Sequence, residues 1–350
     1  MAGTALPRAN AAEVMKYLGK MKFVRFVACI AGLALGWAVA DAKSAGVVFA
    51  MKAPTWMKIT TRDRPSRRAA FAMAYDPVSK KVVLFGGYSG SSYLADTWTF
   101  DGASWQLQHP STSPAGRSAS SMAFDKRTKK LVLFGGYDGV SDRSDTWLWD
   151  GSTGQWSATD SKKSPGALTG PNLFTDPLDG HVDEFGGYDG FLYQLRTWRW
   201  DGNTWELLHK THPPSARAFA EVATNPVTRT TLLFGGLADI NSANTWTWDG
   251  TRWREQSPSM QPPGVYYGAA AYDRALDAVV TFGGGHGGVD LNDTWAWSGA
   301  NWMDLTPTNS PSPRESHGMA FDAAIGHIVL FGGTYYPKHA LYNDTWELIP

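Results

Sequence analysis

Carboxyl, imidazole and phenol groups gather in the last quarter of this 350-residue chain. Groups of these types between aromatic walls could form a pocket with a general acid and a general base. They are also ordinary components of a surface that binds a protein or a sugar. We favour binding, because no spacing of acid, base and nucleophile typical of an enzyme is visible. The candidate residues are Tyr266, Tyr267, His286, Glu315, His317, Tyr335, Tyr336 and His339.

We expect no metal or other cofactor at these residues. His286 lies in the segment GGGHGG, where a single histidine flanked by glycines lacks the several ligands that a bound ion requires. The only cysteine, Cys29, lies in an N-terminal apolar stretch that we expect to be removed. The mature chain would then contain no disulfide, thiolate ligand or cysteine nucleophile.

A repeat of about 49 residues sets the positions of the candidate residues. An apolar run ends in a Gly-Gly pair six times, and two columns of tryptophan keep the same spacing. No Gly-Lys-Ser/Thr follows the glycines, so they are not phosphate-binding loops. Self-similarity of fixed period indicates an array of supersecondary units. The pairs end at Gly87, Gly136, Gly187, Gly236, Gly284 and Gly333, and the tryptophans are Trp56, Trp105, Trp156, Trp205, Trp253 and Trp302, with Trp98, Trp147, Trp198, Trp246, Trp295 and Trp346.

Each repeat is predicted to form four short strands. In the second repeat these are SASSMAFD, KLVLFGG, DTWLWD and QWSAT, which are rich in β-branched and aromatic residues and are separated by turn residues. The pattern resembles the Kelch repeat over residues 53–350. That resemblance implies an all-β fold, a six-bladed β-propeller with one four-stranded blade per repeat. The recurring tryptophans are then expected in the cores of the blades.

The two ends of the repeat region predict closure of the ring. The last segment, NDTWELIP, is a third strand without a following partner, and the segment PTWMKIT around Trp56 is a fourth strand without a preceding one. Pairing them would complete the last blade and remove two exposed strand edges. We therefore expect the N-terminal strand to complete blade six.

One face of the propeller is expected to carry the binding site. The loops that follow Gly-Gly differ between repeats, whereas the opposite face has only tight turns. Variable loops around a central channel favour ligand binding there.

An arginine recurs on the same face at the start of the first strand. A ring of arginines could bind anionic substrates. We favour ion pairs with the acid that opens the third strand, because buried arginines need partners. The pairing is imperfect, since Arg217 faces Asn244 and Asp293 faces Val265. The four arginines are Arg68, Arg117, Arg217 and Arg314, and the acids are Asp96, Asp145, Asp293 and Asp344.

Blade three departs from the others in its second strand. Asp183 and Glu184 replace two apolar residues there. Buried charge needs compensation, which Arg199 or Arg196 could supply. A structural ion pair is favoured over an acid catalyst with a raised pKa.

The first 42 residues are typical of a signal peptide, with basic residues before an apolar stretch from Phe26 to Ala40 and small residues at the predicted cleavage point. Met21 is a possible start, and an uncleaved anchor is the alternative. We expect residues 43–52 to be a linker and the mature chain to be secreted or periplasmic. The whole sequence has 32 basic and 32 acidic residues, which gives no reason to expect nucleic-acid binding.

Three classes of function fit these features. The first, which we favour, is an exported, monomeric binding module for a protein or glycan, without membrane contact after cleavage. The second is a carbohydrate-active enzyme, since Kelch propellers include galactose oxidases and sialic-acid epimerases. The copper radical site of the oxidases needs a cysteine that the mature chain lacks. The third, a ubiquitin-ligase adaptor, is disfavoured by the signal peptide and by the absence of an oligomerisation domain.

Overall fold

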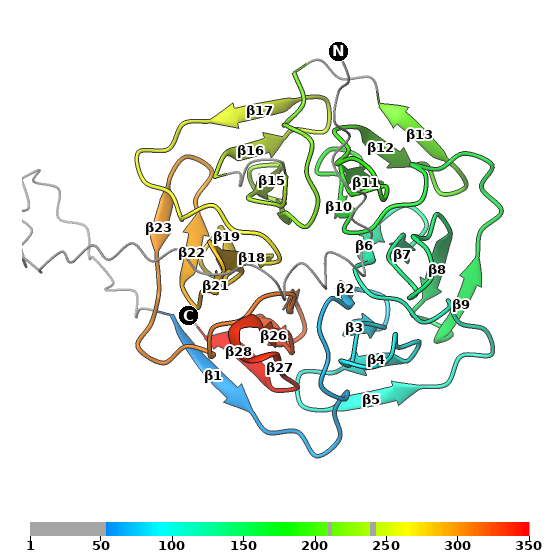
Figure 1. Cartoon of the computed structure of the whole chain (residues 1–350), viewed down its shortest axis with the longest axis horizontal. Helices are drawn as coiled ribbons and strands as arrows, with labels where there is room; N and C mark the ends of the chain where they lie inside the picture. Colours follow the sequence, from blue (N-terminus) through cyan, green and yellow to red (C-terminus); the bar gives the residue numbers. More distant parts are fainter. Residues whose placement is uncertain (1–53, 209–211, 239–242, 350) are drawn as a thin grey trace, which may run out of the picture.

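Six four-stranded antiparallel sheets surround a central axis, as expected for a six-bladed β-propeller (Figure 1). The computed structural model describes residues 54–208, 212–238 and 243–349. The predicted signal peptide and linker lie outside these described residues. No α-helix occurs in the described part of the chain, which has one 3₁₀ turn, η1 (Tyr336–Lys338). Within that part, no helix qualifies as a membrane span.

The strands of each blade run in chain order from the axis to the rim, except in blade six. Blades one to three contain β2 (Ala72–Asp76), β3 (Lys81–Phe85), β4 (Thr97–Phe100) and β5 (Trp105–Gln108); β6 (Ser121–Asp125), β7 (Lys130–Phe134), β8 (Thr146–Asp150) and β9 (Gln155–Ala158); and β10 (Asn172–Thr175), β11 (Val182–Phe185), β12 (Thr197–Trp200) and β13 (Trp205–Leu208). Blades four to six contain β14 (Glu221–Asn225), β15 (Thr230–Phe234), β16 (Thr245–Trp248) and β17 (Trp253–Gln256); β18 (Ala269–Asp273), β19 (Ala278–Phe282), β22 (Thr294–Trp297) and β23 (Trp302–Asp304); and β24 (Gly318–Asp322), β25 (His327–Phe331), β28 (Thr345–Ile349) and β1 (Thr55–Ile59). Two small hairpins extend the last two blades, β20 (Gly285–His286) with β21 (Val289–Asp290) and β26 (Thr334–Tyr335) with β27 (Ala340–Leu341).

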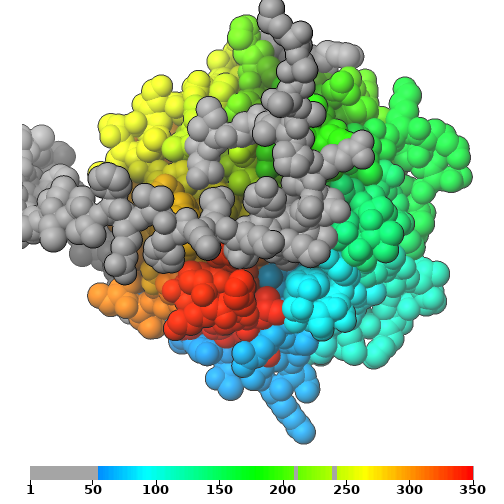
Figure 2. Space-filling view, in the orientation of Figure 1, coloured from blue at the N-terminus to red at the C-terminus, as the bar shows by residue number. Residues whose placement is uncertain are grey.

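The ring is closed by the two ends of the described chain, which confirms the predicted pairing. β1 lies antiparallel to β28, with Trp56 opposite Leu348 and Ile59 opposite Thr345. In Figure 1 the blue β1 forms the outer edge of the red last blade. The space-filling view shows that this red blade packs directly against the first blade (Figure 2).

The core lies between neighbouring blades. On the second strand of blade one, Val82 and Leu84 pack toward blade six, whereas Val83 and Phe85 pack toward blade two. Since side chains alternate between the two faces of a strand, a strand buried on both faces must be apolar at every position. This explains the apolar runs that precede Gly-Gly in the sequence.

A belt of six hydrogen bonds joins the blades near their outer edges. The indole of each fourth-strand tryptophan donates to the threonine that opens the third strand of the preceding blade. Trp56 donates to Thr294, for example, over 3.0 Å. The other five pairs are Trp105–Thr345, Trp156–Thr97, Trp205–Thr146, Trp253–Thr197 and Trp302–Thr245. These bonds satisfy the buried indole nitrogens and explain why threonine precedes tryptophan in every third strand.

A second ring of six hydrogen bonds links the blades around the central axis. One residue just before the first strand of each blade donates its backbone N–H to the carbonyl of its counterpart in the preceding blade, over 2.6 to 3.1 Å. All six residues adopt a left-handed conformation, with φ between 54° and 63°. They are Ala70, Ala119, Gly170, Phe219, Tyr267 and Ser316. This set, the inner ring, separates a cavity on the loop face from the interior of the channel.

Candidate functional site

A cavity of about 360 Å³ opens on the face that carries the loops after Gly-Gly. Its floor includes members of the inner ring, such as Ala119 and Phe219. Five of the six blades contribute tyrosines to its wall. These are Tyr88, Tyr93, Tyr137, Tyr188, Tyr193, Tyr267 and Tyr336. We call this space the tyrosine cavity.

The Gly-Gly pairs place three of these tyrosines. Tyr88 follows Gly87 directly and forms an antiparallel bridge with Ala69, next to the inner ring. Gly86 and Gly87 have φ values of 71° and 101°. A Cβ at Gly86 would lie 2.6 Å from the Arg117 carbonyl oxygen of the next blade, so the backbones approach too closely for a side chain. Tyr137 and Tyr188 are placed in the same way in blades two and three.

The tyrosine rings contact one another along the first three blades. The rings of Tyr88 and Tyr93 are 5.0 Å apart between centroids, and those of Tyr93 and Tyr137 are 5.5 Å apart, nearly perpendicular at 78°. Tyr188 and Tyr193 repeat the first contact at 5.2 Å. Such edge and tilted contacts hold the rings in a fixed wall.

The acid of the tyrosine cavity is Glu315, in blade six. This residue is only 4% exposed, and no hydrogen bond to its carboxylate is found among the described residues. Burial, together with the nearby Asp290 carboxylate, raises the pKa of Glu315 to about 8. Burial also raises the pKa of Asp290 to about 6, although its Oδ2 accepts a 2.6 Å hydrogen bond from the Tyr336 N–H. At neutral pH the cavity therefore holds a protonated Glu315 that is able to donate or lose a proton.

Four of the eight predicted site residues line the tyrosine cavity. They are Tyr267, Glu315, Tyr336 and His339.

The other four candidates lie elsewhere. The ring of Tyr266 and the Glu315 carboxylate both lie against Gly285, which has no side chain. A Cβ at that position would be 2.5 Å from a ring carbon of Tyr266 and 2.5 Å from a carboxylate oxygen of Glu315, so the two groups are adjacent. His286 is exposed on its hairpin, with Nδ1 2.7 Å from the Gly264 carbonyl oxygen. Tyr335 is not part of the wall. His317 lies beyond the inner ring, inside the channel.

The five tyrosines of the first three blades were not among the site residues predicted from the sequence. A signal was present, because tyrosine follows Gly-Gly in those three repeats and is replaced in the others by Leu237, Gly285 and Thr334. The tyrosine cavity is consequently aromatic on one side and acidic on the other.

The recurring arginines lie behind the wall. Arg68, Arg117 and Arg314 are at most 1% exposed and form ion pairs within their own blades with Asp96, Asp145 and Asp344 at 2.7 to 2.8 Å. Against the opposing effect of burial, the hydrogen bonds and charge of Arg117 lower the pKa of Asp145 to about 2. No lysine or arginine is among the described residues that line the tyrosine cavity.

Two blades keep one member of this pair without the other, as the sequence indicated. Arg217 donates to the Gly235 carbonyl and to the Ser215 hydroxyl, and burial lowers the pKa of its guanidinium to about 10. Asp293 accepts a bond from Trp295 at 2.7 Å, and burial raises its pKa.

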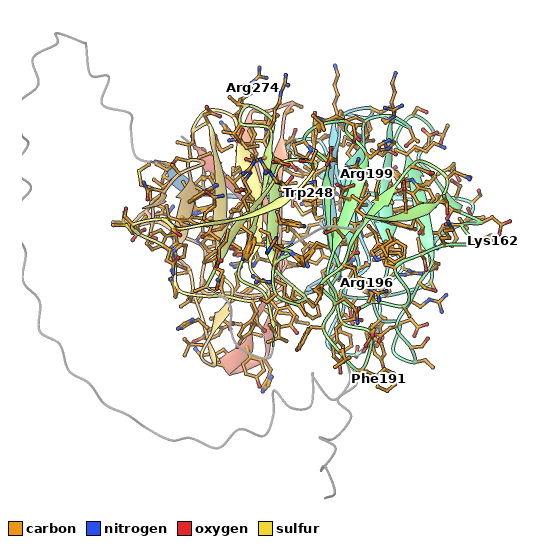
Figure 3. The ribbon with its side chains drawn as sticks, turned by 90° about the horizontal axis from the view of Figure 1, so that it is seen from above. Lys162, Phe191, Arg196, Arg199, Trp248 and Arg274 are labelled. Carbon is orange, nitrogen blue, oxygen red and sulfur yellow. The ribbon has the colours of Figure 1, made fainter. Side chains whose placement is uncertain are left out.

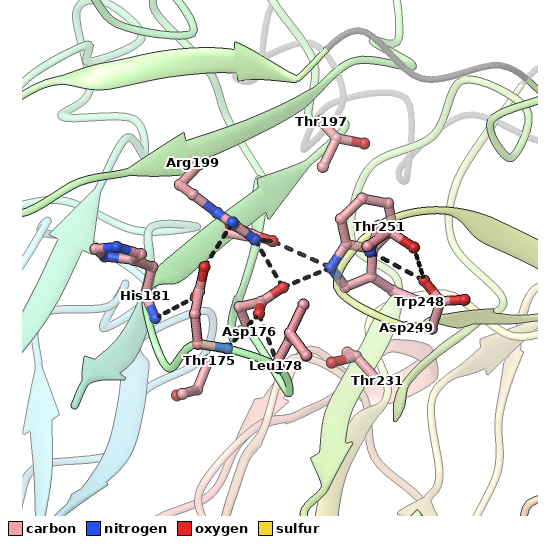
Figure 4. Close-up of polar contacts among 12 residues, drawn as sticks. Thr175, Asp176, Leu178, His181, Thr197, Arg199, Thr231, Trp248, Asp249 and Thr251 are labelled. Atoms are coloured by element: carbon pink, nitrogen blue, oxygen red, sulfur yellow. Dashed lines mark hydrogen bonds and ion pairs between the residues drawn. The ribbon is translucent and has the colours of Figure 1, made fainter. Parts of the chain in front are cut away.

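The acids of blade three form an ion cluster away from the tyrosine cavity (Figure 4). Arg199 contacts Asp183, Asp176 and Asp179 at 2.7 to 2.8 Å, and Trp248 donates to Asp176 and Asp183. Arg199 thus supplies the expected compensation, whereas Arg196 is exposed (Figure 3).

Glu184 on the same strand has no such partner. Its side chain faces blade two and is fully buried, and neither carboxylate oxygen has a hydrogen bond within the described chain. Burial, and then the charge of Asp183, raise the pKa of Glu184 well above its usual value.

Beyond the inner ring, the channel holds two further buried titratable groups. Glu221 and His317 line one small cavity of about 150 Å³. Burial raises the pKa of Glu221 well above its usual value and lowers that of His317 to about 3, so the imidazole is neutral at neutral pH. Over the described ranges, no cluster of three or more histidine, cysteine or acidic side chains is placed to hold a metal ion.

The comparisons with known proteins agree with this architecture. Residues 36–236 match the model of the KLHDC2/KLHL20/DRC7 Kelch-repeats domain. A solved structure titled "Structure of YjhT" is similar with a TM-score of 0.66 at 16% sequence identity, over 81% of this chain and 96% of that one. At this identity the likeness concerns the fold alone. A sequence search of curated proteins found no match.

Proposed function

Because this chain belongs to the family of the KLHDC2/KLHL20/DRC7 Kelch-repeats domain, we propose that it is an exported interaction module that binds a protein or a carbohydrate at the tyrosine cavity. The observation that carries this proposal is the convergence of seven tyrosines from five blades on one cavity at the mouth of the channel. Concave, largely aromatic sites with a few polar groups are typical of ligand binding. Fold alone does not fix function, so the proposal depends on this site.

Exposed apolar side chains beside the tyrosine cavity support a macromolecular partner. Val140 is 88% exposed, and Phe191 and Leu192 are 69% and 68% exposed, on the loops of blades two and three. Figure 3 places Phe191 at the edge of the loop face, opposite Arg274 on the turn face. Apolar groups that rim a cavity favour a contact surface larger than the cavity itself.

The test is a binding screen of the mature protein against a glycan array and against an extract of exported proteins. Tyr93→Ala should abolish binding of a partner at the tyrosine cavity. Tyr272→Phe, which alters a tyrosine outside the cavity, should leave that binding unchanged. A partner that binds equally to both variants would contradict the proposed site. The mass of the exported chain tests the predicted cleavage after Ala40 or Ala42.

A second candidate is a carbohydrate-active enzyme of the epimerase or mutarotase type at the same cavity. The observation that favours it is Glu315, whose pKa of about 8 keeps a proton available at neutral pH beside aromatic walls. NMR of free sugars, sialic acid included, would show anomer or epimer conversion. Conversion that disappears in Glu315→Gln would establish the enzyme, and no conversion of any sugar would leave the binding module.

A further inference from the structure

We propose that the tyrosine cavity binds an alkylated ammonium group, with the tyrosine rings around the cation and the Glu315 carboxylate as its counter-charge. This inference rests on the proposed function, because it names the chemistry of the ligand that the same cavity receives.

The aromatic wall supplies the first half of the argument. A cation is attracted to the face of an aromatic ring, and several rings around one quaternary ammonium form a recognised type of site. Burial raises the pKa of Tyr93 to about 12, and it also raises the pKa of Tyr137 and Tyr188. The rings therefore stay uncharged over the physiological range and keep the electron-rich faces that attract a cation.

The charges around the tyrosine cavity supply the second half. Glu315 is nearly fully buried in the wall, and no partner for its carboxylate is present within the described ranges. Asp142 accepts a 2.8 Å bond from Thr169, which also lines the cavity, and Asp290 lies behind Tyr336. Arg68, Arg117 and Arg314 are buried in ion pairs, and no lysine or arginine is among the described residues that line the cavity. The field inside the cavity therefore favours a cation over an anion.

Alkylation of the ammonium matches a wall built chiefly of aromatic rings, with one carboxylate. A primary ammonium needs up to three hydrogen-bond acceptors when it leaves water. An alkylated ammonium gives up far less hydration and requires only ring faces and one carboxylate. A volume of about 360 Å³ is at the small end of the range of about 300–1,000 Å³ for small-molecule sites, which suits a head group of this kind.

Binding should be coupled to loss of a proton. The groups that face Glu315 are Asp290, Tyr266, Tyr267 and Tyr336, none of which carries a positive charge. His339 also lines the cavity, with its ring against Tyr336, so the variant Glu315→Gln is needed to separate the effect of the carboxylate from that of the imidazole. An incoming cation therefore stabilises the ionised form of Glu315. Since the pKa of Glu315 without ligand is about 8, affinity for the cation should rise as pH increases toward 8.

The experiment measures the affinity of the mature protein for choline by calorimetry and by ligand-observed NMR. The matched neutral probe is 3,3-dimethylbutan-1-ol, which has the same shape without the charge. We expect choline to bind at least about ten-fold more tightly than the alcohol. Choline should bind more tightly at about pH 8.5 than at about pH 6, whereas the alcohol should not change.

Three variants separate the contributions. Glu315→Gln should weaken choline binding about ten-fold and abolish its pH dependence, and Tyr93→Leu should weaken it without changing the pH dependence. Glu206→Gln, the same chemical change on the exposed outer strand β13, should bind choline as the parent does. Melting curves of each variant check that the propeller is folded.

The source of the ammonium is distinguished by a peptide containing trimethyllysine and its unmethylated counterpart. Preference for the methylated peptide over choline assigns the site to a protein partner, and the reverse assigns it to a free small molecule. Equal affinity for choline and its neutral isostere would overturn the inference. If a glycan or neutral partner still bound at the cavity, the proposed function would stand, and only the ammonium would be wrong.

Discussion

Glu184 should destabilise the propeller, and replacing it with leucine should increase stability. Leucine occupies the equivalent position in four of the other blades, as Leu84, Leu133, Leu233 and Leu330. The side chain of Glu184 is fully buried between blades two and three, and both of its oxygens lack a hydrogen-bond partner in the described chain. Leucine would fill the same space without a polar group.

The expected magnitude has two parts. An unsatisfied buried polar group costs about 1–3 kcal/mol even when it is neutral. The raised pKa adds a second cost, because the unfolded chain loses the Glu184 proton above its ordinary pKa of 4.5 while the folded chain retains it. The unfolded state is thereby favoured by about 1.4 kcal/mol for each pH unit above that value, until the folded pKa is reached.

The assay is urea unfolding followed by tryptophan fluorescence at about pH 5.5 and pH 7.5. Glu184→Leu should raise the free energy of unfolding by ~2–4 kcal/mol at the lower pH, and by more at the higher pH. Glu184→Gln should remove only the pH-dependent cost, which comes from the raised pKa. Glu206→Gln should change neither the free energy of unfolding nor its pH dependence. An equal gain at both pH values, or a loss of stability, would refute the assignment of Glu184 as a buried neutral acid.

Other predictions concern the closure of the ring and the buried charges. Trp56→Ala should lower the free energy of unfolding, measured by calorimetry, by ~3–5 kcal/mol, since it removes a fully buried indole and one bond of the outer belt. Deletion of residues 54–60 should open the ring, and an unchanged melting temperature would contradict this. Asp145→Asn should lower the free energy of unfolding by ~3–5 kcal/mol, because Arg117 stays buried without its counter-charge. In the parent protein, the stabilisation that the Asp145 carboxylate provides should disappear as pH falls from 3.8 toward about 2. His317→Gln should reduce the loss of stability on acidification below pH 6.5, because only the unfolded state gains the His317 proton until pH reaches about 3; an unchanged acid transition would exclude this role.

The blades and the closure of the ring follow from patterns that are visible in the sequence. Continuous apolar runs, Gly-Gly pairs and regularly spaced tryptophans indicate the path of the backbone within one repeat, because each depends on neighbours close in the chain. The orphan strand around Trp56 added the one long-range pairing that such a pattern leaves open. The ion pairs of Arg68 and its counterparts were also accessible, since both partners recur at fixed positions within a repeat.

Which side chains share a cavity depends on how the six blades are assembled. Glu315 and His317 are two residues apart, yet they lie on opposite sides of the inner ring, because Ser316 between them adopts φ 55° and bonds across to Tyr267. Five of the six ring residues are not glycine, so composition gave little sign of this left-handed conformation. Five of the six bonds that impose it join residues about 49 positions apart, and the sixth joins Ala70 to Ser316 from the opposite end of the repeat region, so the set forms only when six blades meet around one axis.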